Sequence, residues 1–170
     1  VTGVQKCALP IFPGLFHMRS LLPLFVDLPG RRVLVVGAGP VAASKIEQIR
    51  AAGAEVVVVA PDVHPAIAAS GVVVHRRGFE ESDLDGVWLV VAAAPPAVNA
   101  EVLCAAEGRR VLVNAVDDPA HGSAYMGGVV RRDGVTLAIS TDGAAPGLAG
   151  LLREGLDAVL PTELGEWMAE

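Results

Sequence analysis

The stretch that decides the fold reads Val33-Leu34-Val35-Val36-Gly37-Ala38-Gly39-Pro40-Val41-Ala42, with Lys45 just beyond it. Four apolar residues, mostly β-branched, run into a Gly-x-Gly-x-x-Ala turn, which predicts a strand, a phosphate-binding turn and a helix. The first glycine permits the tight turn, the second lets a pyrophosphate approach the backbone, and the alanine lets helix and strand pack closely. Proline suits the first helical position, and the helix N-terminus offers free amides to an anion. A glycine pair between a strand and a helix also serves plain packing, so the turn alone leaves a dinucleotide site open.

The composition is typical of a globular domain that handles small molecules. The 170 residues suffice for one domain with a core, and 52% hydrophobic with only 4% aromatic residues indicate a core of Val, Leu and Ala. A net charge of −6 argues against a nucleic-acid partner. Cys7 and Cys104 are too few for a disulfide scaffold, which favours a cytoplasmic protein. No apolar run reaches the roughly 18 residues of a membrane span, so we expect no membrane partner.

The two ends of the sequence carry separate expectations. Residues 1–17 resemble a mistranslated sequencing adapter or a disordered leader, with Met18 as the expected start, and we exclude them from fold reasoning. Thr162 can cap a further helical segment that stops at Glu170, so we expect a C-terminally truncated chain.

Strand-like and helical segments alternate through the first two thirds of the chain. After the opening strand, apolar runs at 55–60, 72–75, 87–92 and 111–114 predict further strands, with helices between them at about 41–51 and 95–107. This alternation predicts an α/β fold with a doubly wound, Rossmann-like parallel sheet, to which we assign residues 18–122.

The pattern changes after this domain. Apolar runs at 129–131 and 135–140 flank Asp133-Gly134, a signal for an antiparallel hairpin. Pro146 then opens a long helix whose apolar face comprises Leu148, Leu152, Leu156 and Val159. We assign residues 123–170 to this hairpin and C-terminal helix, an extension that either forms a dimer interface or completes the core.

Acidic residues follow two of the predicted strands. Asp62 lies two residues beyond the second strand, where it is either a ribose ligand or, as we favour, the N-cap of a short helix through Ala68. No arginine directly follows that strand, so a 2′-phosphorylated cofactor is not supported. The fifth strand ends at Asn114, and Asp117 follows it; a carboxylate here is either a general base facing a nicotinamide or part of an ordinary Asp-Asp-Pro turn.

The remaining polar residues form no recognisable site. The histidines lack metal-ligand spacing, so we expect no metal site and assign all four to loops or the surface: His17, His64, His75 and His121. Three basic pairs are expected in loops, mostly solvated but able to meet an acidic substrate: Arg76-Arg77, Arg109-Arg110 and Arg131-Arg132.

Several motifs together point to one family. They are Leu22-Pro23-Leu24-Phe25, the stretch Val35–Ala42 with Lys45, Val113–Pro119, Ala138–Pro146 and Leu151-Leu152-Arg153-Glu154. In this order they resemble the precorrin-2 dehydrogenase domain of sirohaem synthases, the nucleotide-binding part of a bifunctional dehydrogenase and ferrochelatase.

The resemblance implies NAD-dependent oxidation of the tetrapyrrole precorrin-2 to sirohydrochlorin, with Fe(II) insertion as a second activity and a homodimer for the full-length protein. It implies Asp117 as the catalytic residue, with Asn114 as its neighbour. The cofactor contacts that it implies fall on Gly37, Gly39, Pro40, Val41, Pro61 and Asp62. The alternative is a nucleotide-sensing regulatory module, which has no need of Asn114 or Asp117.

Overall fold

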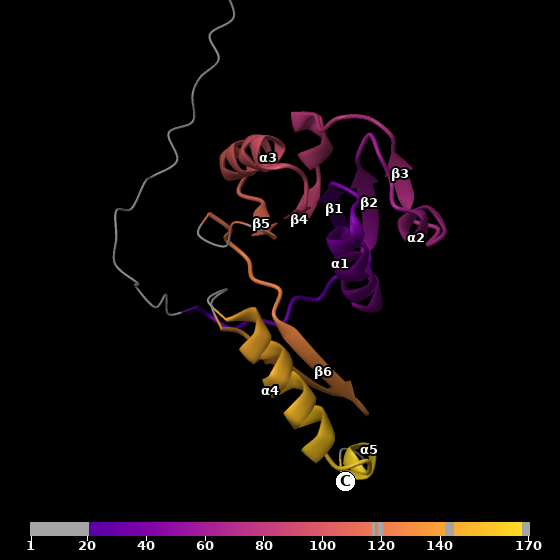
Figure 1. Cartoon of the computed structure of the whole chain (residues 1–170), viewed down its shortest axis with the longest axis vertical. Helices are drawn as coiled ribbons and strands as arrows, with labels where there is room; N and C mark the ends of the chain where they lie inside the picture. The colour runs from indigo at the N-terminus through magenta and orange to yellow at the C-terminus, as the bar shows by residue number, and fades with distance from the viewer. Residues whose placement is uncertain (1–20, 117, 119–120, 142–144, 168–170) are drawn as a thin grey trace, which may run out of the picture. The chain divides into compact units, whose positions relative to one another are not determined.

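The chain divides into two compact units, which are drawn together in Figure 1. The computed structural model describes residues 21–116, 118, 121–141 and 145–167. The leader predicted at residues 1–17 and the predicted catalytic residue Asp117 lie outside the described residues. The first unit covers residues 22–124, and the second begins at Tyr125.

A five-stranded parallel sheet forms the centre of the first unit. Its strands are β1 (Arg32–Val36), β2 (Glu55–Val59), β3 (Val73–His75), β4 (Val87–Ala92) and β5 (Leu112–Ala115). They lie in the order β3-β2-β1-β4-β5, and every pairing is parallel. The predicted Rossmann-like sheet is therefore confirmed, and the order of strands reverses between β1 and β4, where such folds bind ligands.

Helices connect these strands and cover both faces of the sheet. They are α1 (Pro40–Ala51), α2 (Pro65–Ala68), the 3-10 helix η1 (Glu81–Leu84) and α3 (Pro96–Arg109). Leu34, Val90 and Val113 occupy one face and pack in the same core cluster as Val102 and Ala106 of α3. Right-handed crossovers that leave β1 and β4 in opposite directions put α1 and α3 on opposite faces (Figure 1).

The second unit is the predicted hairpin followed by a helix. Strands β6 (Gly128–Arg132) and β7 (Val135–Ile139) pair antiparallel. Both turn residues have positive φ, 46° at Asp133 and 84° at Gly134, as a type I′ turn requires. Helices α4 (Pro146–Val159) and α5 (Leu164–Trp167) follow. The sequence signal for a hairpin is thus confirmed, but Arg131 and Arg132 lie in β6 and not in a loop.

The apolar face of α4 is not buried in the described chain. Leu148, Leu152 and Leu156 are 50%, 45% and 36% exposed, and Val159 is 74% exposed. Contact with the hairpin is made instead by the buried Ala149 and by Arg153, which lie close to Gly128, and by an ion pair between Asp157 and Arg132 of β6. The extension was predicted either to form a dimer interface or to complete the core. Within the described residues, its leucines do not complete the core.

Candidate active site

The carboxyl ends of β1 and β4 meet where the strand order reverses. Backbone hydrogen bonds continue the sheet into both following loops, from Ala93 N to Val36 O at 2.8 Å and from Gly37 N to Val59 O at 2.9 Å. The glycine turn after β1 and the loop after β4 therefore lie side by side. In open α/β sheets, ligands bind outside the carboxyl ends of the strands at the point where the strand order reverses.

Gly37 is required by packing as well as by its backbone conformation. Its φ is 97°, a region that side chains with a Cβ rarely adopt, and a Cβ built there would lie 2.2 Å from Ala93 O. The first glycine of the motif thus allows the ends of β1 and β4 to approach each other closely.

Gly39 differs, because it faces open space. It is the N-cap of α1 in an extended conformation, and a Cβ built on it meets no atom within 4 Å. Pro40 occupies the first helical position, so the helix leaves the N–H groups of Val41 and Ala42 without an intrahelical acceptor. Open space beside free amides at a helix N-terminus fits the pyrophosphate of a dinucleotide.

The loop after β2 is tied to this turn by a backbone hydrogen bond. His64 N donates to Ala38 O at 2.9 Å, so the segment that contains Pro61 and Asp62 runs next to the glycine turn. Both residues are exposed. The expectation that Asp62 caps the short helix is wrong: α2 begins only at Pro65, so the N-cap is His64, whose Nδ1 accepts from Ala66 N at 3.3 Å. An N-cap must directly precede the first helical residue, and Asp62 lies too early in the chain.

Asn114 lies in β5, beside Val91 of β4, and is 6% exposed. Strand β5 ends one residue later than predicted, at Ala115. The Asn114 side chain donates from Nδ2 to Ala124 O at 3.0 Å, whereas Oδ1 is buried and has no hydrogen-bond partner in the described part of the chain. A buried acceptor without a donor is costly, which marks Asn114 as more than a packing residue. Asp117 follows two residues after β5 in the sequence but lies outside the described residues.

The sequence analysis missed a hydrogen-bonded histidine–aspartate pair in the loop after β5. His121 Nδ1 lies 2.6 Å from Asp118 Oδ2, and His121 N also donates to Asp118 O. The side chains of both residues are partly exposed. Their i,i+3 spacing around Asp-Pro was the available signal, and it was interpreted only as turn chemistry.

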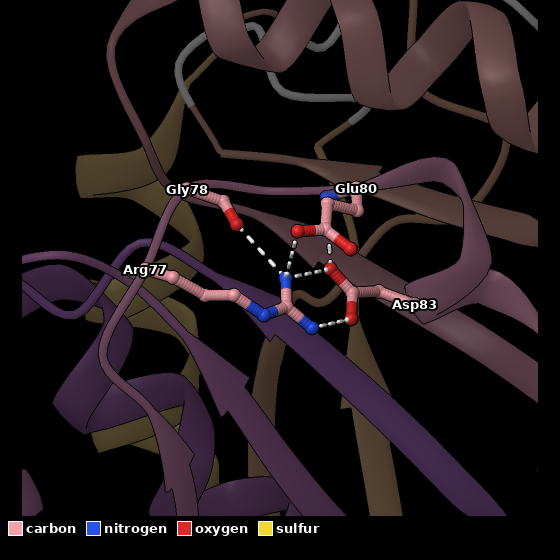
Figure 2. Close-up of polar contacts among 4 residues, drawn as sticks. All are labelled: Arg77, Gly78, Glu80 and Asp83. Atoms are coloured by element: carbon pink, nitrogen blue, oxygen red, sulfur yellow. Dashed lines mark hydrogen bonds and ion pairs between the residues drawn. The ribbon is translucent and has the colours of Figure 1, made fainter.

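Each arginine pair contains one residue that is bound and one that is exposed. Arg77 donates to both carboxylate oxygens of Asp83 and to Gly78 O, and it lies 3.9 Å from Glu80, as Figure 2 shows. Arg109 and Arg132 likewise form ion pairs with acidic residues. The other residue of each pair is exposed, namely Arg76, Arg110 and Arg131, and Arg109 is exposed as well in spite of its ion pairs.

Asp83, Arg77 and Lys45 have shifted pKa values. The hydrogen bonds from Arg77 lower the pKa of Asp83 and raise that of Arg77, and the backbone N–H of Glu80 lowers the pKa of Asp83 further. Partial burial on α1 lowers the pKa of Lys45, because desolvation disfavours the ammonium form. Within the described residues, no cluster of three or more His, Cys, Asp or Glu could hold a metal ion.

Comparison with known proteins identifies the family. Residues 24–128 match the family model described as putative NAD(P)-binding. The solved structure of SirC, precorrin-2 dehydrogenase, is 32% identical and aligns with a TM-score of 0.70 over 88% of this chain and 76% of that one. The chain belongs to the precorrin-2 dehydrogenase family. NAD, the predicted cofactor, is thereby confirmed.

Other members of the precorrin-2 dehydrogenase family are longer than this chain. The siroheme synthase of Sodalis glossinidius (strain morsitans) is 44% identical over 153 residues, which cover 87% of this chain and 32% of that protein. Siroheme synthase 1 of Cronobacter sakazakii (strain ATCC BAA-894) is 46% identical over 154 residues, with 88% and 32% covered. The chain thus spans about a third of the length of these relatives. No helix among the described residues is long and apolar enough to cross a membrane.

Proposed function

We propose that the chain catalyses the NAD-dependent dehydrogenation of precorrin-2 to sirohydrochlorin. The observation that carries the proposal is the arrangement at the carboxyl ends of the strands: Gly39 faces open space after β1, α1 begins there with free amides, and β5 ends next to β4. Similarity to SirC, precorrin-2 dehydrogenase, supports this choice of substrate.

In this proposal the residues at these strand ends have separate tasks. Gly39, Pro40 and Val41 line the pyrophosphate, while Pro61 and Asp62 border the adenosine ribose. When bound, NAD supplies the acceptor for the hydride that leaves a substrate carbon.

In this proposal the proton is accepted by a residue that follows β5. A carboxylate oxygen of Asp117 accepts the proton that the substrate loses together with the hydride, so that two electrons and two hydrogens leave in all. Asn114 donates from Nδ2 to Ala124 O, and its buried Oδ1 keeps an acceptor that no described residue uses.

An anaerobic assay with precorrin-2 and NAD⁺ tests this function. We expect NADH and the absorption spectrum of sirohydrochlorin to appear together, and we expect Asp117→Asn to abolish both while NAD⁺ still binds. The matched control is Glu107→Gln, which removes the same negative charge from an exposed residue of α3. Unaltered turnover in Asp117→Asn would remove Asp117 from this role.

Titration with NAD⁺ in the presence and absence of sirohydrochlorin separates the dehydrogenase from a nucleotide sensor. A sensor should bind NAD⁺ with the same affinity whether or not sirohydrochlorin is present. The enzyme should bind the tetrapyrrole and, if it also inserts iron, should convert sirohydrochlorin to sirohaem when Fe(II) is added. Iron insertion is the second activity that the family resemblance implies.

We further propose that the chain forms a homodimer through α4 and that it works in the cytoplasm. Exposed leucines at positions 148, 152 and 156 recur every four residues, which gives one apolar stripe along the helix. A stripe of this kind is typical of a helix that packs against a partner. The small number of cysteines supports the location.

A further inference from the structure

The edge of the sheet beyond β2 carries an arginine that the proposed dehydrogenase reaction does not use. The last rung between β2 and β3 pairs Val59 with His75, and Ala60 N then donates to His75 O at 3.1 Å. The same carbonyl accepts from Arg77 N at 3.0 Å, which closes a three-residue turn with Arg76 at its apex. Arg76 therefore leaves the sheet one strand away from the segment that contains Pro61 and Asp62.

The two arginines of this pair are in opposite situations. Arg77 is held by Asp83, Gly78 and Glu80 in the cluster of Figure 2, so its guanidinium is committed to the β3–β4 crossover. Arg76 is exposed and makes no hydrogen bond or ion pair with the rest of the described chain. Asp62 is equally exposed and equally without such a partner there. Arg76 and Asp62 thus follow the adjacent strands β3 and β2 at their carboxyl ends, and neither has a charged partner in the described chain.

These two charges lie where a Rossmann fold distinguishes the two forms of its dinucleotide. A carboxylate after β2 binds the ribose 2′-hydroxyl of NAD, whereas a nearby guanidinium accommodates the 2′-phosphate of NADP. Arginine suits this phosphate because its planar fork can donate two parallel hydrogen bonds. Here the acid stands two residues beyond the end of β2, and the arginine comes from β3 instead of directly following β2.

We propose that Arg76 binds the 2′-phosphate of NADP, so that this chain accepts both forms of the dinucleotide. The inference rests on the proposed NAD-dependent function, because it assumes that the adenosine half of the cofactor lies over the end of β2. It revises the expectation from sequence that a 2′-phosphorylated cofactor is unsupported: the searched-for arginine is absent after β2 but present on the neighbouring strand.

Calorimetric titration of the full chain with NAD⁺ and with NADP⁺ tests the inference. Arg76→Gln should raise the dissociation constant for NADP⁺ by about 10-fold or more, the loss expected for a charge-assisted pair, and change that for NAD⁺ by less than about twofold. Asp62→Asn should raise the dissociation constant for NAD⁺ and leave that for NADP⁺ unchanged. The matched control is Arg32→Gln, which removes the same charge from the exposed first residue of β1, at the amino ends of the parallel strands, and it should alter neither constant.

The outcomes distinguish this inference from the function on which it rests. If NAD⁺ binds but NADP⁺ does not, or if Arg76→Gln leaves NADP⁺ binding unchanged or weakens both cofactors equally, the role of Arg76 is overturned and the dehydrogenase proposal stands. If neither dinucleotide binds to the wild-type chain, the proposed function itself fails.

Discussion

The two units of the chain bury their apolar side chains to very different extents. Every buried hydrophobic residue of the described chain except Val130 and Ala149 belongs to the first unit, where valines and alanines of the sheet pack against α1 and α3. The second unit has a hairpin and an amphipathic helix but leaves a row of leucines exposed. The difference teaches that the first unit has a core of its own, whereas the second leaves its apolar face exposed, which supports the dimer interface proposed for it.

The largest expected effect comes from breaking the first unit at Gly37. Gly37→Val forces a Cβ to within 2.2 Å of Ala93 O and a β-branched residue into a φ of 97°. Because neither conflict can relax without moving β1 or β4, we expect the free energy of unfolding to fall by about 3 kcal/mol or more. Urea unfolding followed by circular dichroism measures this loss. An unchanged unfolding midpoint would contradict the close approach of the two strand ends.

A smaller effect is expected at the second unit, where Leu152 is changed to glutamate. Burial of one leucine contributes about 2 kcal/mol, so a charge at this position should raise the dissociation constant of the proposed dimer by roughly 30-fold or more. Analytical ultracentrifugation measures the constant, and NAD⁺ affinity should stay the same because the cofactor site lies in the first unit. Glu154→Gln on the same helix is the control. A Leu152→Glu chain that dimerises as tightly as the wild type would place the interface elsewhere.

The smallest effect is expected at the β3–β4 crossover of the first unit. Arg77 lowers the pKa of Asp83, so the folded state gains stability from the ionised carboxylate. This gain is complete above the unfolded pKa of about 3.9 and is lost as the pH falls through the lower, folded-state pKa. Asp83→Asn should therefore lower the melting temperature by a few degrees at pH 7. The difference from the wild type should shrink below about pH 4, and a difference that persists undiminished in acid would show that the ion pair is not its cause.

The sequence predicted most of the strands and helices, but few of the individual side-chain contacts. The parallel sheet and the hairpin followed from apolar runs, Gly37 and Asp133-Gly134, because these residues permit few alternative backbones. The N-cap was predicted at Asp62 but lies at His64, because the sequence does not show that the short helix begins only at Pro65.

Pairing of side chains was equally hidden from the sequence. Nothing in Arg76-Arg77 tells which residue binds Asp83, because the answer depends on how the chain turns after β3. The role of Asp117 stays a prediction, since it was carried over from the family resemblance and Asp117 lies outside the described residues.

The central claim is that a dinucleotide lies against the turn between β1 and α1, and Gly39→Thr tests it most directly. Threonine is a favourable N-cap in the extended conformation that Gly39 adopts, and its side chain would enter open space, so the fold should be kept. That space is where the pyrophosphate must lie. Calorimetric titration with NAD⁺ should show at least about a 10-fold loss of affinity while the melting temperature stays within about 1 °C of the wild type. Wild-type affinity for NAD⁺ in a folded Gly39→Thr chain would contradict the claim.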